Sequence, residues 1–234
     1  MRKALYGQWE RIRHSVVGLM FHPGQLTAEY RDRQRARSVA PWRLAFNALS
    51  FFFVMSLITD FHLTSIAAQD TSGLVSSVVE STVERTHLAR ETVVERVERR
   101  FSTFYMALLT LSVATYTLLV GLTHRQSGQP WGVHAVFALH WAAWNFLVAV
   151  AFYGLVHLLR SGFVLPAPTM QLARNVLLGT LLLLASIYLF IAFRRVYGDR
   201  PLAALLKVGI VLAVGAQVDK VVLALAFRLT MASI

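Results

Sequence analysis

The sequence predicts an all-α membrane protein: a bundle of about five transmembrane helices, with an interfacial N-terminal helix and a long extracytoplasmic amphipathic helix. Apolar residues make up 56% of the 234 residues and charged residues only 15%, whereas soluble domains are about 45–50% apolar and about 25% charged. Five stretches are long and apolar enough to cross a bilayer. Lys and Arg are concentrated at the N-terminus, as expected for a cytoplasmic segment.

Each predicted span holds roughly 20 mostly apolar residues, the length that a bilayer-crossing helix needs. Backbone groups inside lipid must pair with one another, so these runs are predicted to be helices. Polar or Pro- and Gly-containing segments such as 125–130 and 165–168 separate them as loops. The five predicted spans are 42–61, 101–122, 133–159, 172–193 and 202–227.

The charge distribution predicts the orientation of the chain. Residues 1–43 carry nine Lys or Arg residues against three acidic ones, whereas residues 60–100 carry seven acidic residues against five Arg. Because Lys and Arg favour cytoplasmic loops, we expect a cytoplasmic N-terminus and an extracytoplasmic C-terminus. The segment 124–132 contains a single Arg, so its cytoplasmic assignment depends on the alternation of the spans.

The chain is expected to divide into a basic cytoplasmic arm, 1–41, and a transmembrane bundle, 42–234, that includes the extracytoplasmic segment 62–100. Leu5, Trp9, Ile12 and Val16 recur at helical spacing, which predicts an amphipathic helix that ends at 22–24. Such a helix suits the headgroup region of an anionic leaflet, so membrane lipids are expected partners. The candidate lipid contacts, which also fit a topology signal alone, are Arg11, Arg13, Arg31, Arg33, Arg35 and Arg37.

Residues 74–100 form a second amphipathic stretch, in which valines recur at helical spacing and Glu residues alternate with Arg. This stretch either continues unbroken into the span at 101–122 and projects from the membrane, or forms a separate helix on the membrane surface. An exposed valine stripe far from lipid needs a partner to cover it. The candidate partner contacts are Val75, Val79, Val83, Val93 and Val97.

Polar side chains inside the predicted spans are candidates for function, because such groups are costly in lipid. Gln217 and Lys220 are three residues apart and share a helical face, whereas Asp219 points elsewhere. The set fits a polar pathway or proton relay, and it also fits an ion pair or hydrogen bonds between helices with Lys220 extended toward the interface. The candidates for this intramembrane polar site are His134, His140, Asn145, Gln217, Asp219 and Lys220.

The sequence offers little support for an enzyme. The chain contains no Cys, which excludes disulfides, thiolate metal sites and Cys nucleophiles. It also lacks the common phosphate-binding, metalloprotease and serine-hydrolase motifs. Histidines on two helices could hold a haem, but no further motif supports one. We therefore expect no catalytic residues, no metal site, no cofactor and no nucleic-acid partner.

Three segments carry motifs of a known family. The first is PGQLTAEY at 23–30, followed by a basic run and PWRL at 41–44; the second is HAVFALH at 134–140; the third is RRVYG at 194–198. Together they resemble the bacterial polytopic membrane proteins catalogued as domain-of-unknown-function family 3667. The resemblance implies a bacterial inner-membrane protein with no assigned activity. It marks Glu29, Arg194, Arg195 and Tyr197, while the Cys-rich N-terminal segment of many members is missing here.

These observations favour a non-enzymatic function. We expect an integral membrane scaffold or accessory subunit that binds other membrane proteins or forms a homo-oligomer. The alternative is a small permease or ion or proton pathway that uses the polar residues inside the bundle, although the sequence shows no inverted repeat of the kind common in transporters.

Overall fold

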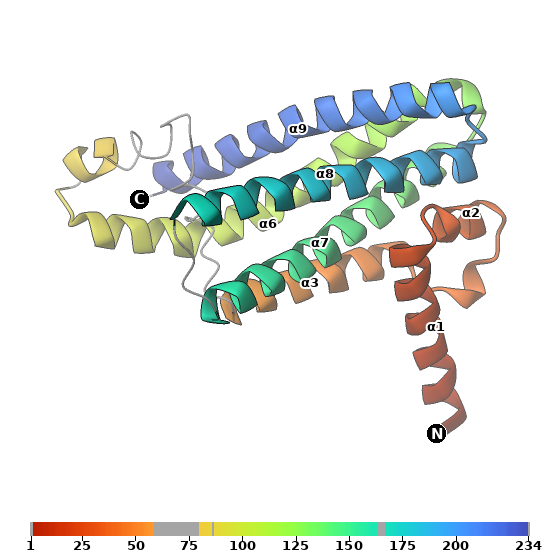
Figure 1. The fold of residues 1–234 in the computed structure, drawn as a ribbon, viewed down its shortest axis with the longest axis horizontal. Coiled ribbons are helices and arrows are strands. Elements are labelled where there is room, and N and C mark those ends of the chain that lie inside the picture. The colour runs from red at the N-terminus through yellow and green to blue at the C-terminus, as the bar shows by residue number, and fades with distance from the viewer. Residues whose placement is uncertain (1, 59–79, 86, 163–166, 234) are drawn as a thin grey trace.

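The computed structural model describes residues 2–58, 80–85, 87–162 and 167–233, and every regular element within these ranges is helical. Five long helices lie alongside one another, and the N-terminal helix α1 extends away from one end of this bundle (Figure 1). The bundle helices are α3 (Pro41–Ile58), α6 (Arg90–Thr123), α7 (Trp131–Gly162), α8 (Ala167–Tyr197) and α9 (Pro201–Ala232). The N-terminal helices are α1 (Arg2–Phe21) and α2 (Gln25–Arg31).

Three of these helices are long and apolar enough to cross a membrane. Their apolar parts are Trp131–Phe152, Asn175–Tyr197 and Pro201–Thr230, and α6 contributes a shorter apolar part, Leu111–Thr123. The prediction of an all-helical protein with membrane-type helices is therefore confirmed for the described residues. The count of five spans stays a prediction, since the described parts of α3 and α6 do not reach the same length of apolar helix.

The predicted loop at 165–168 is partly wrong, because α8 already begins at Ala167. Pro168 lies in the first turn of this helix, where the missing amide hydrogen has no intrahelical partner to lose. Pro168, which was expected to mark a loop, therefore marks a helix start. Pro201 plays the same part at the start of α9.

The predicted amphipathic stretch at 74–100 is not one continuous helix within the described residues. Residues 80–85 are helical and 87–89 are not. His87 has a φ of 56°, in the left-handed region that interrupts a right-handed helix. Helix α6 begins at Arg90 and runs through the predicted start of the span at 101. The alternative of one unbroken helix from 74 through the span is therefore wrong, since the helix is interrupted at 87–89.

Helix α7 lies between α3 and α6, and α9 packs against α6 and α8. Aromatic rings connect α7 to α8: the ring centroids of Trp144 and Tyr188 are 4.5 Å apart, and those of Phe137 and Phe193 are 5.3 Å apart. These rings belong to one core with buried aliphatic residues from all five bundle helices. Such close-packed side chains fix the helices relative to one another.

The N-terminal arm packs onto the bundle through α2, a short helix that the sequence did not predict. Gly24 makes the turn before α2 with a φ of +77°, and a Cβ added there would lie 2.9 Å from the Cα of Ala192 on α8. Both the backbone conformation and the close approach therefore require glycine. Leu19 and Leu26 are buried in the same core as α7 and α8, so the expected arm and bundle share one core.

Candidate functional site

Polar contacts hold α2 against α7 and α8. The hydroxyl of Thr27 and Nδ1 of His140 are 2.9 Å apart and form a buried hydrogen bond. The guanidinium of Arg31 donates to the Val196 carbonyl at 2.6 Å, and that of Arg195 donates to the Pro23 carbonyl at 3.0 Å. His140, a predicted intramembrane residue, and Arg195, which the RRVYG motif marked, thus bind the N-terminal arm.

Glu29, which the first motif marked, makes polar contacts within the N-terminal arm. Its carboxylate accepts a hydrogen bond from the Gln25 side-chain amide at 2.8 Å and lies 3.0 Å from Nε2 of His14 on α1. The contact with His14 connects α1 to α2, whereas the hydrogen bond from Gln25 lies within α2 and positions the carboxylate. Arg194, which the RRVYG motif also marked, is exposed, and its guanidinium lies over the Phe190 ring.

A second group of polar residues, here the turn cluster, lies at the same end of the bundle and consists of His124, His134, Tyr197, Asp199 and Lys207. Asp199 is 2.9 Å from Nε2 of His124 and accepts a 2.6 Å hydrogen bond from the Lys207 ammonium. The Tyr197 hydroxyl lies 3.0 Å from Nδ1 of His134. The cluster therefore connects the ends of α6, α7, α8 and α9.

His124 is the most buried member of the turn cluster, with 1% of its surface exposed, and its ring stacks on Tyr197 with centroids 3.8 Å apart. Burial, with a smaller contribution from the Lys207 charge, lowers the pKa of His124 to about 4 against the opposing effects of the Val120 carbonyl and Asp199. The sequence did not predict Asp199 and Lys207 as site residues. The signal was that Asp199 is one of only two acidic residues after Glu98.

The outer face of α9 points away from the rest of the chain. Gln217 and Lys220 are both exposed there, as their shared helical face predicted. Small residues continue this face toward the start of α9, and they too are exposed; we define the α9 outer face as Gly209, Ala213, Ala216, Gln217 and Lys220.

Asp219 turns to the other side of α9 and accepts a 3.0 Å hydrogen bond from the Tyr116 hydroxyl of α6. Gly215 makes room for this tyrosine, since an added Cβ would lie 2.5 Å from the hydroxyl oxygen. A cavity of about 240 Å³ opens between α6, α7 and α9, lined by Tyr116, Asp219 and Asn145 among others. The Asn145 amide donates to the Trp141 carbonyl at 2.8 Å.

The six candidate intramembrane residues therefore lie at four separate places. His134 belongs to the turn cluster and His140 to the α2 contact. Asn145 and Asp219 line the 240 Å³ cavity, while Gln217 and Lys220 are on the α9 outer face. The structure does not bring them together at one site.

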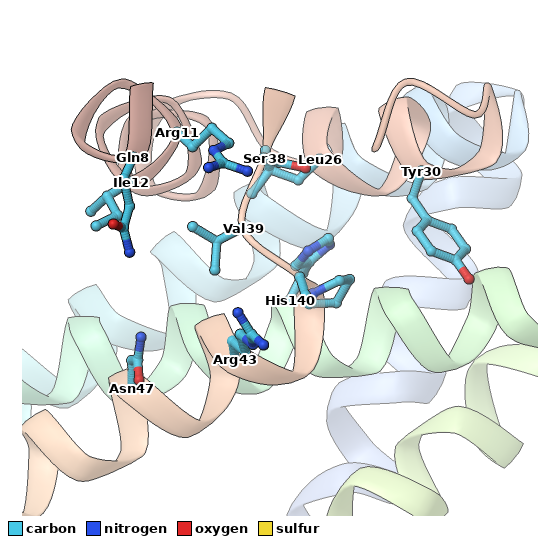
Figure 2. A pocket seen from close by; sticks show the side chains of 12 residues that line it. Gln8, Arg11, Ile12, Leu26, Tyr30, Ser38, Val39, Arg43, Asn47 and His140 are labelled. Carbon is cyan, nitrogen blue, oxygen red and sulfur yellow. The ribbon is translucent and has the colours of Figure 1, made fainter. Parts of the chain in front are cut away.

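The larger cavity, about 650 Å³, lies between α1, α2 and the start of α3. Figure 2 shows Arg11 of α1 and Arg43 of α3 on opposite sides of the space, with His140 of α7 beside them. We call this the arginine pocket. Its polar lining residues are Gln8, Arg11, Tyr30, Ser38, Arg43, Asn47 and His140, and its apolar ones include Ile12 and Leu26.

Among the five predicted lipid contacts whose side chains the structure describes, Arg11 alone lines the arginine pocket. Arg13 pairs with Glu10 at 2.9 Å and Arg31 with Asp32 at 2.8 Å. The hydrogen bond from Arg31 lowers the pKa of Asp32, and the same contact raises that of Arg31. Of the other predicted contacts, Arg33 and Arg37 are exposed, and the Arg35 side chain lies outside the described residues.

Arg43 was not among the predicted lipid contacts, although it directly follows Trp42 at the start of an apolar helix. That position was a usable signal. Aromatic and basic side chains are typical of the membrane–water boundary. The Arg43 guanidinium lies 5.2 Å from the centroid of the Trp42 ring.

The structure describes the side chains of two candidate partner contacts on the valine stripe, Val83 and Val93. Val93 is fully buried inside the chain and Val83 is half-buried. Neither side chain is therefore fully exposed to a partner. Val75, Val79 and the side chain of Val97 lie outside the described residues. In the part of the chain that the structure describes, no group of three or more His, Asp or Glu side chains is placed to hold a metal ion.

One family model matches residues 10–59 of this chain. Its description is protein of unknown function, DUF3667. This match confirms the resemblance to the DUF3667 family for the segment from α1 to the end of α3. Ten of the twelve residues that line the arginine pocket lie within the matched segment. Neither the curated proteins nor the solved structures contain a match to this chain.

Proposed function

We propose that this chain is an integral membrane scaffold or accessory subunit that associates with another membrane protein, or with a second copy of itself, through the α9 outer face. The observation that carries the proposal is the exposure of Gln217 and Lys220 within an apolar helix. A polar side chain that faces lipid loses hydrogen bonds that lipid cannot replace. A neighbouring helix can supply them.

The depth of Gln217 along α9 makes lipid a poor environment for it. Gln217 lies about 24 Å from Pro201 along the helix axis, in a helix whose apolar part runs over Pro201–Thr230. The long Lys220 side chain can extend toward the nearer interface. The shorter Gln217 amide cannot, so a hydrogen-bonding partner on an adjacent helix is the favourable arrangement.

The small residues of the α9 outer face support a helix partner further. Gly209 and Ala213 are four residues apart, the spacing at which two membrane helices approach each other closely. A Cβ added at Gly209 would meet no atom of this chain within 4 Å. The space next to Gly209 is thus available to another helix.

The proposal places the protein in the inner membrane of a bacterium, with a cytoplasmic N-terminus and an extracytoplasmic C-terminus. Helices α6 and α8 end at the same end of the bundle as α2 (Figure 1). Arg194 and Arg195 lie in the last turn of α8, and Arg125 and Arg200 follow the ends of α6 and α8. This clustering of arginines at one end agrees with the preference of Lys and Arg for the cytoplasmic side.

A small permease or ion pathway is the second candidate, because the 240 Å³ cavity places Asn145 and Asp219 next to Tyr116 between three helices. A cavity with polar groups is a feature that a transport site requires. Only two of the six polar candidates meet there, and so the association function has the stronger support.

The test adds bulk to the α9 outer face without disturbing the chain itself. In the Gly209→Leu variant, the new side chain projects into open space, so the fold is expected to persist while a helix partner is displaced. Gly179→Leu is the matched control, because Gly179 is also an exposed glycine with no atom near its Cβ position, but lies on α8. Native mass spectrometry of mildly extracted membranes measures the assembly.

We expect the wild type and Gly179→Leu to be extracted in the same complex, and Gly209→Leu to lose most of it. A Gly209→Leu protein that keeps the wild-type complex would contradict the proposal. A wild type that is extracted only as a monomer would also contradict it and favour the pathway function, for which ion flux into proteoliposomes is the assay.

A further inference from the structure

We propose that the arginine pocket binds the phosphate headgroup of an anionic phospholipid. The proposal is independent of the α9 outer face, since the two lie on different helices and involve no common residue. Its basis is the charge of the pocket, its place in the fold and the apolar surface at its rim.

The charge of the arginine pocket is unbalanced. Arg11 and Arg43 line it, and no acidic side chain of the described residues does. Within the described residues, the nearby carboxylates are engaged elsewhere: Glu10 with Arg13, Glu29 with His14, and Asp32 with Arg31. Two guanidinium groups on opposite sides of one cavity can both donate to the oxygens of a phosphate, an anion whose geometry matches the fork of N–H donors in arginine.

Neutral donors surround the two arginines. The side-chain amides of Gln8 and Asn47 line the space from α1 and α3 (Figure 2), and the Ser38 hydroxyl lines it from the linker between them. A phospholipid headgroup offers phosphate, ester and hydroxyl oxygens to such donors. The volume of about 650 Å³ falls in the usual range for small-molecule sites.

The pocket lies at the corner between two helices that run in different directions. Helix α1 extends crosswise to the bundle, whereas α3 runs along it (Figure 1). A helix that lies across the spans, with Trp9 and Phe21 exposed, suits the plane of the headgroups. The corner between such a helix and a bundle helix is therefore at headgroup depth.

Apolar surface continues from the rim of the pocket along α3. Trp42 and Phe46 are 59% and 58% exposed, and Trp42 adjoins the pocket residues Pro41 and Arg43. An acyl chain can lie along these rings while its phosphate remains between Arg11 and Arg43. This continuity favours a lipid over a soluble phosphate compound, which has no chain to place there.

The test measures lipid binding to the delipidated full-length protein in detergent by native mass spectrometry. Phosphatidylglycerol is the anionic probe and phosphatidylcholine the zwitterionic one. The Arg11→Gln/Arg43→Gln variant removes both pocket cations. The matched control, Arg125→Gln/Arg200→Gln, removes two exposed cations at the same end of the bundle that do not line the pocket.

We expect the first phosphatidylglycerol to bind more tightly than phosphatidylcholine, and the pocket variant to weaken it roughly tenfold or more, because charge-assisted hydrogen bonds are lost. The control should change it less than about twofold. The proposal is overturned by equal binding of the two lipids, by an unchanged affinity in the pocket variant, or by an equal loss in the control.

Soluble glycerol 3-phosphate distinguishes the two sources of a phosphate. Retention of phosphatidylglycerol in the presence of a large excess of glycerol 3-phosphate supports a lipid site that uses the acyl chains. Full displacement by an equimolar amount would assign the pocket to a soluble phosphate compound and overturn the lipid. Because Arg11 and Arg43 are both exposed, equal melting temperatures of the variants and wild type should verify that the fold is intact.

Discussion

At the scale of the residue, His124 shows how burial controls a charge. Its ring lies in the turn cluster with 1% exposed surface, and burial lowers its pKa to about 4, from an ordinary value of about 6.5. The unfolded chain therefore binds a proton at His124 more readily than the folded one does. The contribution of His124 to the free energy of unfolding is therefore fully present above about pH 6.5 and is lost as the pH falls toward 4.

We expect the free energy of unfolding of the wild type to fall by on the order of 3 kcal/mol between pH 7.5 and pH 4 through His124. His124→Gln should show a smaller decrease over the same range. Thermal unfolding in detergent at several pH values measures the effect. The exposed His22 provides the control, since His22→Gln should keep the full acid sensitivity. An undiminished pH dependence in His124→Gln would disprove this role.

At the scale of the element, α2 shows how tertiary contacts hold a short helix in place. A seven-residue helix is too short to be stable in isolation, so α2 depends on its contacts with α7 and α8. Its buried hydrogen bond joins Thr27 to His140. If the Thr27 hydroxyl is removed, Nδ1 of His140 stays buried in the core without its hydrogen-bond partner.

Thr27→Val should destabilise the attachment of α2 by about 1–3 kcal/mol, because it leaves a buried polar group without its partner. Thr27→Ser keeps the hydroxyl and should lose less. Hydrogen exchange of the backbone amides in 25–31 is the measurement, with faster exchange expected in the Val variant alone. Equal protection in the Val and Ser variants would show that the hydrogen bond contributes little.

At the scale of the whole molecule, the alternating directions of the bundle helices place the two termini at opposite ends (Figure 1). We expect the linker after α2 to be cytoplasmic and the C-terminus to be extracytoplasmic. The chain has no Cys, so a single introduced cysteine is labelled without background. The two useful positions are Gln34→Cys and Ser233→Cys, both at exposed residues.

A membrane-impermeant maleimide should label Ser233→Cys in intact spheroplasts and Gln34→Cys only after permeabilisation. Each variant is the control for the other, because both become accessible once the membrane is opened. The reverse pattern would overturn the orientation. Labelling of both positions in intact cells would overturn the alternation of the spans on which it is based.

What the sequence by itself determined is the helical, membrane-type composition and the approximate place of each long helix. Apolar length and turn residues are local properties, and the helices at 131–162, 167–197 and 201–232 follow them. The sharing of one face by Gln217 and Lys220 also follows from helical spacing alone. The resemblance to the DUF3667 family likewise depended on short local motifs, and the match at 10–59 confirmed it.

Only the tertiary structure decided which polar residues meet. Asp199 reaches His124 across 75 positions of sequence, and Thr27 reaches His140 across 113. No periodicity encodes such pairs, because they depend on how whole helices pack. The packing of the helices also places the six intramembrane candidates at four separate sites, and it places Arg11 and Arg43 around one pocket. A helical pattern specifies which face a side chain occupies, whereas the packing of the bundle determines what that face meets.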